Sequence, residues 1–217
     1  MSLVMKASRL EFGFLAILLL SMSDLLAQAP VPQGLQDGDM EAWSTYVLSQ
    51  SDWLNPDVVD GSIPSSWRVM QYPANGQVVD QPRAVIARDD SEKHGGGSSL
   101  RIESGNNAAL LVQRFNLDPS ADYVLRFWAK GENLPENAVP VKIWLKKGSE
   151  VATGGDFYDS ATTTELKGDP ISGSFDWKPF EIPFRVETDS GIELRVEVSG
   201  PEAKFWIDDV VVERAKP

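Results

Sequence analysis

Two segments of the chain each place a tryptophan two residues after a basic residue. Trp128 follows Arg126, and Trp144 follows Lys142. If both segments are strands, side chains at such spacing share one face, and the apolar residues between them take the other. An outward aromatic ring beside hydrogen-bond donors suits a sugar, because a sugar has apolar C–H faces and a rim of hydroxyl groups. The spacing therefore predicts a binding surface rather than a reaction centre.

The two rings come close if their strands pair as a hairpin across residues 131–140. The donors beside the rings then complete the surface, together with two further side chains that the same count places outward. The candidate carbohydrate-binding residues are Trp128, Trp144, Arg126, Lys142, Gln113 and Arg195. A structural interpretation stays open, because a loop can cover such a ring and because cation–aromatic packing is common on protein surfaces.

The residues for most catalytic chemistries are absent. The chain has no cysteine and one histidine, His94, in a glycine-rich segment. This excludes thiolate catalysis and cysteine-bound metals, and it argues against Ser-His and His-metal sites. Acidic residues are plentiful, but their spacing singles out no pair of the kind that a glycosidase needs. A non-enzymatic protein is expected, with glycosidase activity as the remaining alternative.

The charge balance limits the classes of partner. The 217 residues carry a formal net charge of −12. Nucleic acids and anionic lipids are bound through clusters of Lys and Arg, so neither is an expected partner. A carbohydrate is the partner that the surface residues favour, and a protein of the cell envelope is the alternative.

The first residues read as an export signal. Basic residues precede the apolar run 12–20, and small residues follow it near Ala27. This pattern is typical of a secretory signal peptide, which we expect to span 1–27 and to be cleaved. A short linker, 28–34, then leads into one domain, 35–215. The protein is therefore expected to be secreted, periplasmic or in the cell envelope, without membrane insertion after cleavage; an uncleaved anchor is the alternative.

Alternating apolar and polar residues indicate strands throughout the domain. Clear examples are 98–103, 122–130, 141–146, 180–187, 191–198 and 204–212, with further candidates near 67–72, 83–88 and 108–117. Turn-forming residues separate them, so an all-β sandwich or barrel is predicted. Pro183 within its strand suggests an edge or a bulge. Two longer stretches, 44–64 and 147–174, are predicted to be loops.

Four blocks resemble jelly-roll carbohydrate-binding modules of the family 4, 9, 16 and 22 type, which have the galactose-binding-like fold. The blocks are Asp37-Gly38-Asp39-Met40-Glu41, then His94 to Ile102, then Tyr123 to Gly131, and finally Ile207-Asp208-Asp209-Val210. The resemblance implies a jelly-roll β-sandwich of two antiparallel sheets with roughly 8–10 strands. It also implies a non-catalytic module that binds a poly- or oligosaccharide. An adhesion or protein-interaction module on the same fold is the alternative, and an accessory part of a glycoside hydrolase is a weaker one.

The resemblance also implies a structural calcium ion. It places the ligands at Glu41 and Asp209, with Asp208 as a further candidate. Alternation favours Asp209, because it falls on the same strand face as Phe205 and Ile207, and an inward carboxylate is costly unless it is paired or bound to a metal. The opposing interpretation is that both aspartates end a strand and face solvent.

Overall fold

Strand alternation places apolar side chains on one face of each of two sheets, and these faces pack together. The computed structural model describes residues 33–46, 57–73, 83–105, 107–136, 140–146, 163–167, 171–187 and 192–216. The predicted signal peptide and almost all of the linker lie outside these ranges. In the described residues we find strands and one short 3-10 turn but no helix able to span a bilayer.

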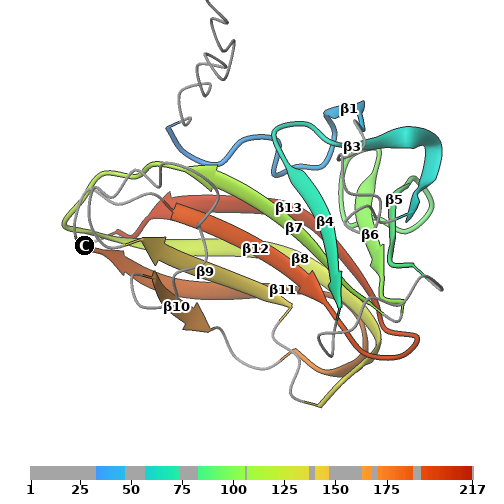
Figure 1. The fold of residues 1–217 in the computed structure, drawn as a ribbon. Coiled ribbons are helices and arrows are strands. Elements are labelled where there is room, and N and C mark those ends of the chain that lie inside the picture. The colour runs from blue at the N-terminus through green and yellow to red at the C-terminus, as the bar shows by residue number, and fades with distance from the viewer. Residues whose placement is uncertain are drawn as a thin grey trace, which may run out of the picture. The chain divides into compact units, whose positions relative to one another are not determined.

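The first sheet has five described strands. In order across the sheet they are β10 (Thr163–Lys167), β9 (Val141–Lys146), β12 (Ile192–Val198), β7 (Asn107–Phe115) and β4 (Arg68–Pro73). All four pairings are antiparallel. Figure 1 shows this sheet in front of the second one.

The second sheet has six described strands. Their order is β11 (Gly173–Val186), β8 (Ala121–Leu134), β13 (Lys204–Arg214), β6 (Ser99–Glu103), β5 (Val85–Asp89) and β2 (Asp57–Val58). The short β2 pairs with β5 in parallel, and the other pairings are antiparallel. β1 (Trp43–Thr45) and β3 (Ser62–Pro64) form a small sheet of their own, and the 3-10 turn Val59–Gly61 leads into β3.

These sheets confirm the all-β jelly-roll prediction. Each of the nine expected strand segments corresponds to a strand of the two main sheets. Two differences concern the expected loops: 44–64 contributes β2 and β3, and 147–174 contributes β10. With these short strands, the described part of the chain has eleven strands in the main sheets rather than eight to ten.

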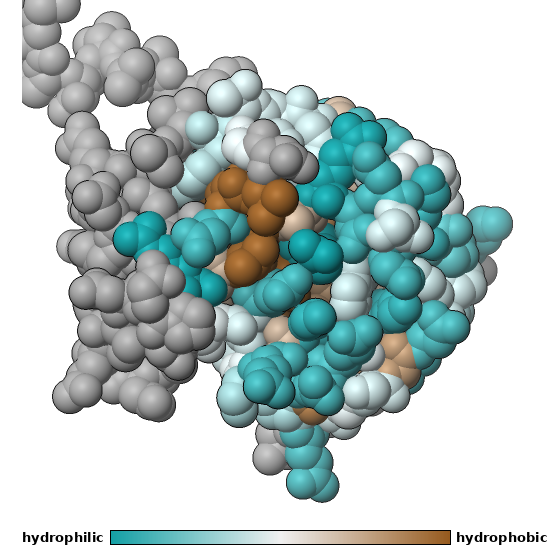
Figure 2. All heavy atoms as spheres, turned by 90° about the vertical axis from the view of Figure 1, so that its right-hand side faces the viewer, coloured by the Kyte–Doolittle hydropathy of each residue, from teal (hydrophilic) through white to brown (hydrophobic). Residues whose placement is uncertain are grey.

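The core lies between the two sheets. Phe127, Leu125 and Phe205 enter it from the six-stranded sheet, and Ile143 and Leu194 enter it from the five-stranded one, all at most 1% exposed. Full burial of one such side chain stabilises the fold by about 1.5–3 kcal/mol. The face that carries β3, β5 and β6 is mostly hydrophilic where it is described, with one compact apolar patch (Figure 2).

β11 is the edge of the six-stranded sheet, as Pro183 predicts. Pro179 and Pro183 lie opposite Trp128 and Val124 of β8. Proline has no N–H to donate, so it is tolerated in a strand where its nitrogen faces away from the neighbouring strand.

A buried carboxylate joins β5 to β13. Asp89 is 6% exposed and accepts hydrogen bonds from Trp206 Nε1 at 3.0 Å, from the Ser91 hydroxyl at 2.7 Å and from the N–H groups of Ser91 and Glu92. Burial opposes the charged form, but these donors outweigh it and lower the pKa of Asp89 to about 2. Because the folded-state pKa lies below the unfolded value of about 3.9, the charged carboxylate stabilises the fold above pH 4, and this contribution is lost as the pH falls towards 2.

We predict that Trp206→Phe lowers the free energy of unfolding at pH 7 by about 1.5–3 kcal/mol, the range for a hydrogen bond to a charged group. The loss should shrink between pH 4 and pH 2. Trp177→Phe is the control, since Trp177 Nε1 has no hydrogen-bond partner in the described part of the chain. Urea unfolding across this pH range measures both variants, and an equal cost for the two would contradict the assignment.

Candidate functional site

The two tryptophans that the sequence singles out lie on different sheets. Trp128 belongs to β8 in the six-stranded sheet, and Trp144 belongs to β9 in the five-stranded sheet. The predicted hairpin across 131–140 is therefore wrong, because β8 pairs with β11 and β13 whereas β9 pairs with β10 and β12. The two rings cannot form one platform. Arg126, which shares its strand with Trp128, forms surface ion pairs with Glu181 and Glu213.

Trp128 packs against the glycine-rich loop. The ring of His94 stacks on it with centroids 3.6 Å apart and planes at 10°, and Trp177 lies 6.3 Å from His94 at a tilted angle. One face of the Trp128 ring is thus occupied by another residue of the chain. This arrangement is the covered ring that the structural interpretation allows.

Trp144 lies on the outer face of the five-stranded sheet. Its neighbours in sequence, Ile143 and Leu145, face or contact the core, so the indole is on the opposite side. The guanidinium of Arg195, from β12, lies 3.9 Å from the ring centroid. The indole Nε1 is buried and has no hydrogen-bond partner among the residues that the structure describes. Trp144 is therefore a half-buried ring with an unused donor, held in place by a cation.

Charged side chains surround this ring. Glu193 of β12 accepts from Arg195, and it also accepts from Arg114 of β7 at 2.9 Å. Lys142 lies two residues before Trp144 and contacts Glu197 at 3.0 Å. These five side chains form a polar network over three strands, which we call the outer-face network. Arg195 is only 8% exposed, so the network is built into the sheet rather than laid on it.

Gln113 is not part of this network. Its register partner Leu194 is a core residue, so Gln113 faces the inner side of the sheet, contrary to the prediction. There it is 2% exposed and exchanges two hydrogen bonds of 2.7 Å with the backbone of Gln36. Its role is to fix the beginning of the domain.

The sequence of β7 does not alternate in polarity, so its two faces cannot be told apart from the sequence. The residues that face outward on this strand are also apolar: Ala108, Leu110 and Val112.

The three expected calcium ligands all contact the glycine-rich loop 93–98. Glu41 Oε1 accepts from Gly97 N–H at 2.6 Å and from Ser98 N–H at 3.2 Å. Asp208, fully buried, accepts from the N–H groups of His94 and Gly95 at 3.0 and 3.1 Å. Asp209 Oδ2 lies 2.8 Å from His94 Nδ1.

A bulge changes which aspartate is inward. The register between β13 and β8 shifts between Asp208 and Val211, and Asp209 has a left-handed backbone with φ of 49°. Val210 therefore takes the core position, and Asp209 is directed to the loop with a side chain 41% exposed. The alternation argument for an inward Asp209 is wrong. Burial raises the pKa of the Asp208 carboxyl, because its N–H partners only partly offset the lost hydration.

Glu41 and Asp209 supply the kind of oxygen ligand that calcium prefers, but they supply fewer ligands than a calcium ion takes. Glu41 and Asp209 are hard carboxylate ligands, and both lie against loop glycines. A Cβ added at Gly96 would be 2.0 Å from Glu41 Oε1, and one added at Gly95 would be 3.1 Å from Asp209 Oδ2. Calcium takes six to eight oxygens. Among the described residues no group of three or more acidic or histidine side chains is arranged to hold a metal ion, so calcium stays a prediction.

Comparisons with known proteins complete the description of the site. No protein-family model and no curated protein matches the chain. Similar solved structures include a family 4 carbohydrate-binding module at 15% identity, covering 84% of this chain and 100% of that one, with a TM-score of 0.48. A family 61 module in complex with β-1,4-galactotriose has 23% identity, coverages of 70% and 90%, and a TM-score of 0.40.

A third similar structure belongs to an enzyme. The enzymatically active domain of tailspike protein 4 from bacteriophage CBA120 has 16% identity and a TM-score of 0.47. The match covers 70% of this chain but one fifth, 20%, of the tailspike chain. At these identities and TM-scores, none of the three assigns a ligand or a reaction to this protein.

Proposed function

We propose that this protein is a secreted, non-catalytic carbohydrate-binding module that holds a poly- or oligosaccharide on the outer face of its five-stranded sheet. The observation that carries the proposal is the placement of Trp144. Its ring lies on a sheet face turned away from the core, and charged side chains from β7, β9 and β12 surround it.

The residue types of this face suit a sugar better than a protein surface. A protein-interaction site has an apolar centre with few charges. Here the ring is bordered by Lys142 and Arg195, each already fixed by a carboxylate. Charged side chains that are held in place bind hydroxyl groups with little loss of conformational entropy. The ion-paired residues and the fixed ring thus form a preorganised surface for a saccharide.

We predict that Trp144→Ala weakens binding to a retained polysaccharide by about 30-fold, the loss for removal of a central aromatic contact worth 2 kcal/mol. A glycan array of the mature chain identifies the ligand, and affinity electrophoresis measures the variants. Trp144→Phe should keep part of the affinity.

Trp128→Ala is the matched control, because Trp128 lies on the other sheet. It should leave binding unchanged while circular dichroism confirms the fold. Binding that is lost in Trp128→Ala and kept in Trp144→Ala would move the site to the six-stranded sheet. If no glycan binds, the alternative of an envelope protein-interaction module replaces the proposal.

The same module is proposed to hold a structural calcium through Glu41 and Asp209. Both carboxylates contact the loop 94–98 from opposite ends of the domain sequence, so a shared cation would join the three segments. The ion would neutralise them and stabilise the fold; it would take no part in binding the saccharide.

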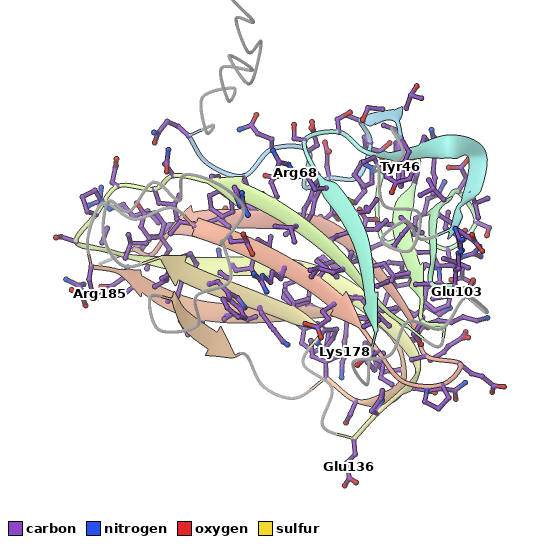
Figure 3. The ribbon with its side chains drawn as sticks, viewed as in Figure 1. Tyr46, Arg68, Glu103, Glu136, Lys178 and Arg185 are labelled. Carbon is purple, nitrogen blue, oxygen red and sulfur yellow. The ribbon has the colours of Figure 1, made fainter. Side chains whose placement is uncertain are left out.

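Calcium at 100 times its dissociation constant should stabilise the protein by about 2.7 kcal/mol and raise Tm by about 5–10 °C over the chelator-treated protein. The Tm of Glu41→Gln and Asp209→Asn should no longer respond to calcium. Glu136→Gln is the control, since Glu136 is an exposed acid after β8, away from the loop (Figure 3). Identical melting curves with calcium and with chelator would contradict the calcium proposal.

A further inference from the structure

Basic residues occupy one row of the five-stranded sheet. Arg68 of β4 lies opposite Val112 of β7, which lies opposite Arg195 of β12, which lies opposite Lys142 of β9. Neighbouring strands are about 4.8 Å apart, so the row extends over about 14 Å. Like charges directly opposite each other are destabilising. The adjacent Arg195 and Lys142 therefore need anions close by.

The carboxylates of the outer-face network already supply these anions. Glu193 accepts from Arg114 and Arg195, and Glu197 accepts from Lys142. Their side chains are only 13% and 21% exposed. Among the described side chains of this face, both carboxylates are thus committed to cations of the protein. They are poorly placed to accept hydrogen bonds from the hydroxyl groups of a ligand.

Among the described residues of this face, the exposed polar group without a partner is a donor. Arg68, labelled in Figure 3, is exposed at the start of β4 and forms no ion pair or hydrogen bond with the described residues. Trp144 Nε1 has no partner among the described residues but is buried, so it is not open to a ligand. A hydroxyl group both donates and accepts, whereas a carboxylate or sulfate only accepts. Donors without free acceptors complement an anion, and a guanidinium binds one with two parallel hydrogen bonds.

Resting on the proposed function, we propose that the saccharide is acidic and that Arg68 binds its carboxylate or sulfate groups. Arg68 supplies the positive charge that no described carboxylate compensates, and Trp144 supplies the ring contact. The net charge of −12 does not oppose this at short range. Charges farther away than the Debye length, about 8 Å at physiological salt, are largely screened.

The test compares polymers that differ in charge alone. Polygalacturonate is measured against its fully methyl-esterified form, and dextran sulfate against dextran, by affinity electrophoresis of the mature chain. We expect at least one acidic polymer to bind and its uncharged counterpart to bind at least tenfold more weakly. The two pairs distinguish a carboxylate ligand from a sulfate ligand.

Arg68→Ala should weaken binding of the acidic polymer by about tenfold or more, as for the loss of a charge-assisted hydrogen bond. Arg68→Lys should restore part of it. Arg185→Ala is the matched control, because Arg185 is an exposed arginine of β11 on the other sheet. Since Arg68 is exposed and has no partner among the described residues, its removal should leave the melting temperature unchanged.

Two outcomes overturn the inference in different ways. If a neutral polymer binds as well as the acidic one and Arg68→Ala has no effect, the ligand is not acidic but the proposed function stands. If neither these polymers nor any member of a glycan array binds, the proposed function fails, and the inference fails with it.

Discussion

One irregularity in the last strand joins segments that are far apart in the sequence. At Asp209 the backbone of β13 enters the left-handed region, and the strand loses register with β8. The N–H of Val210 then bonds to the carbonyl of Gly38, 2.7 Å away. A side chain at position 38 would place its Cβ 1.9 Å from the Val210 oxygen, so only glycine allows this approach. At the same point, the buried Asp208 accepts hydrogen bonds from the N–H groups of His94 and Gly95.

The four sequence blocks that resemble carbohydrate-binding modules lie at this junction or beside it. Three of them meet there: the segment 37–41, the glycine-rich loop and the middle of β13. The fourth, in β8, is the neighbour of β13 in the six-stranded sheet. The residues that carry the resemblance to carbohydrate-binding modules therefore hold distant segments of the sandwich together. None of them belongs to the outer-face network. This is why the resemblance predicts the fold and not the ligand.

Strands were predictable because their two faces differ in polarity, and strand neighbours were not. Alternation in 141–146 places Trp144 outward, which the structure confirms. It cannot show that the chain crosses between sheets after β8, so Trp128 and Trp144 were placed together in error. Gln113 follows the apolar run 108–112, where both faces of the strand are buried and alternation is lost. Alternation predicts an inward Asp209 because the left-handed backbone at this residue, which reverses the count, has no signal in the sequence.

The ion pairs of Arg185 and those of the outer-face network differ in how far they are exposed to water. Exposed ion pairs such as those of Arg185 contribute little to stability, since water and salt screen them. Those of the outer-face network are largely withdrawn from water, and removal of one partner would leave the other buried without compensation. A surface of this kind resists rearrangement, so a ligand meets groups whose positions are already fixed.

The two prolines of β11 bear on how copies of the chain behave towards each other. An open sheet edge is a template on which another strand can add, and long exposed edges lead to aggregation. Pro179 and Pro183 remove donors four residues apart along this edge, so an incoming strand would meet a broken hydrogen-bond ladder. This edge thus disfavours edge-to-edge addition of a second sandwich, and copies of the chain bound side by side along one polymer would remain separate.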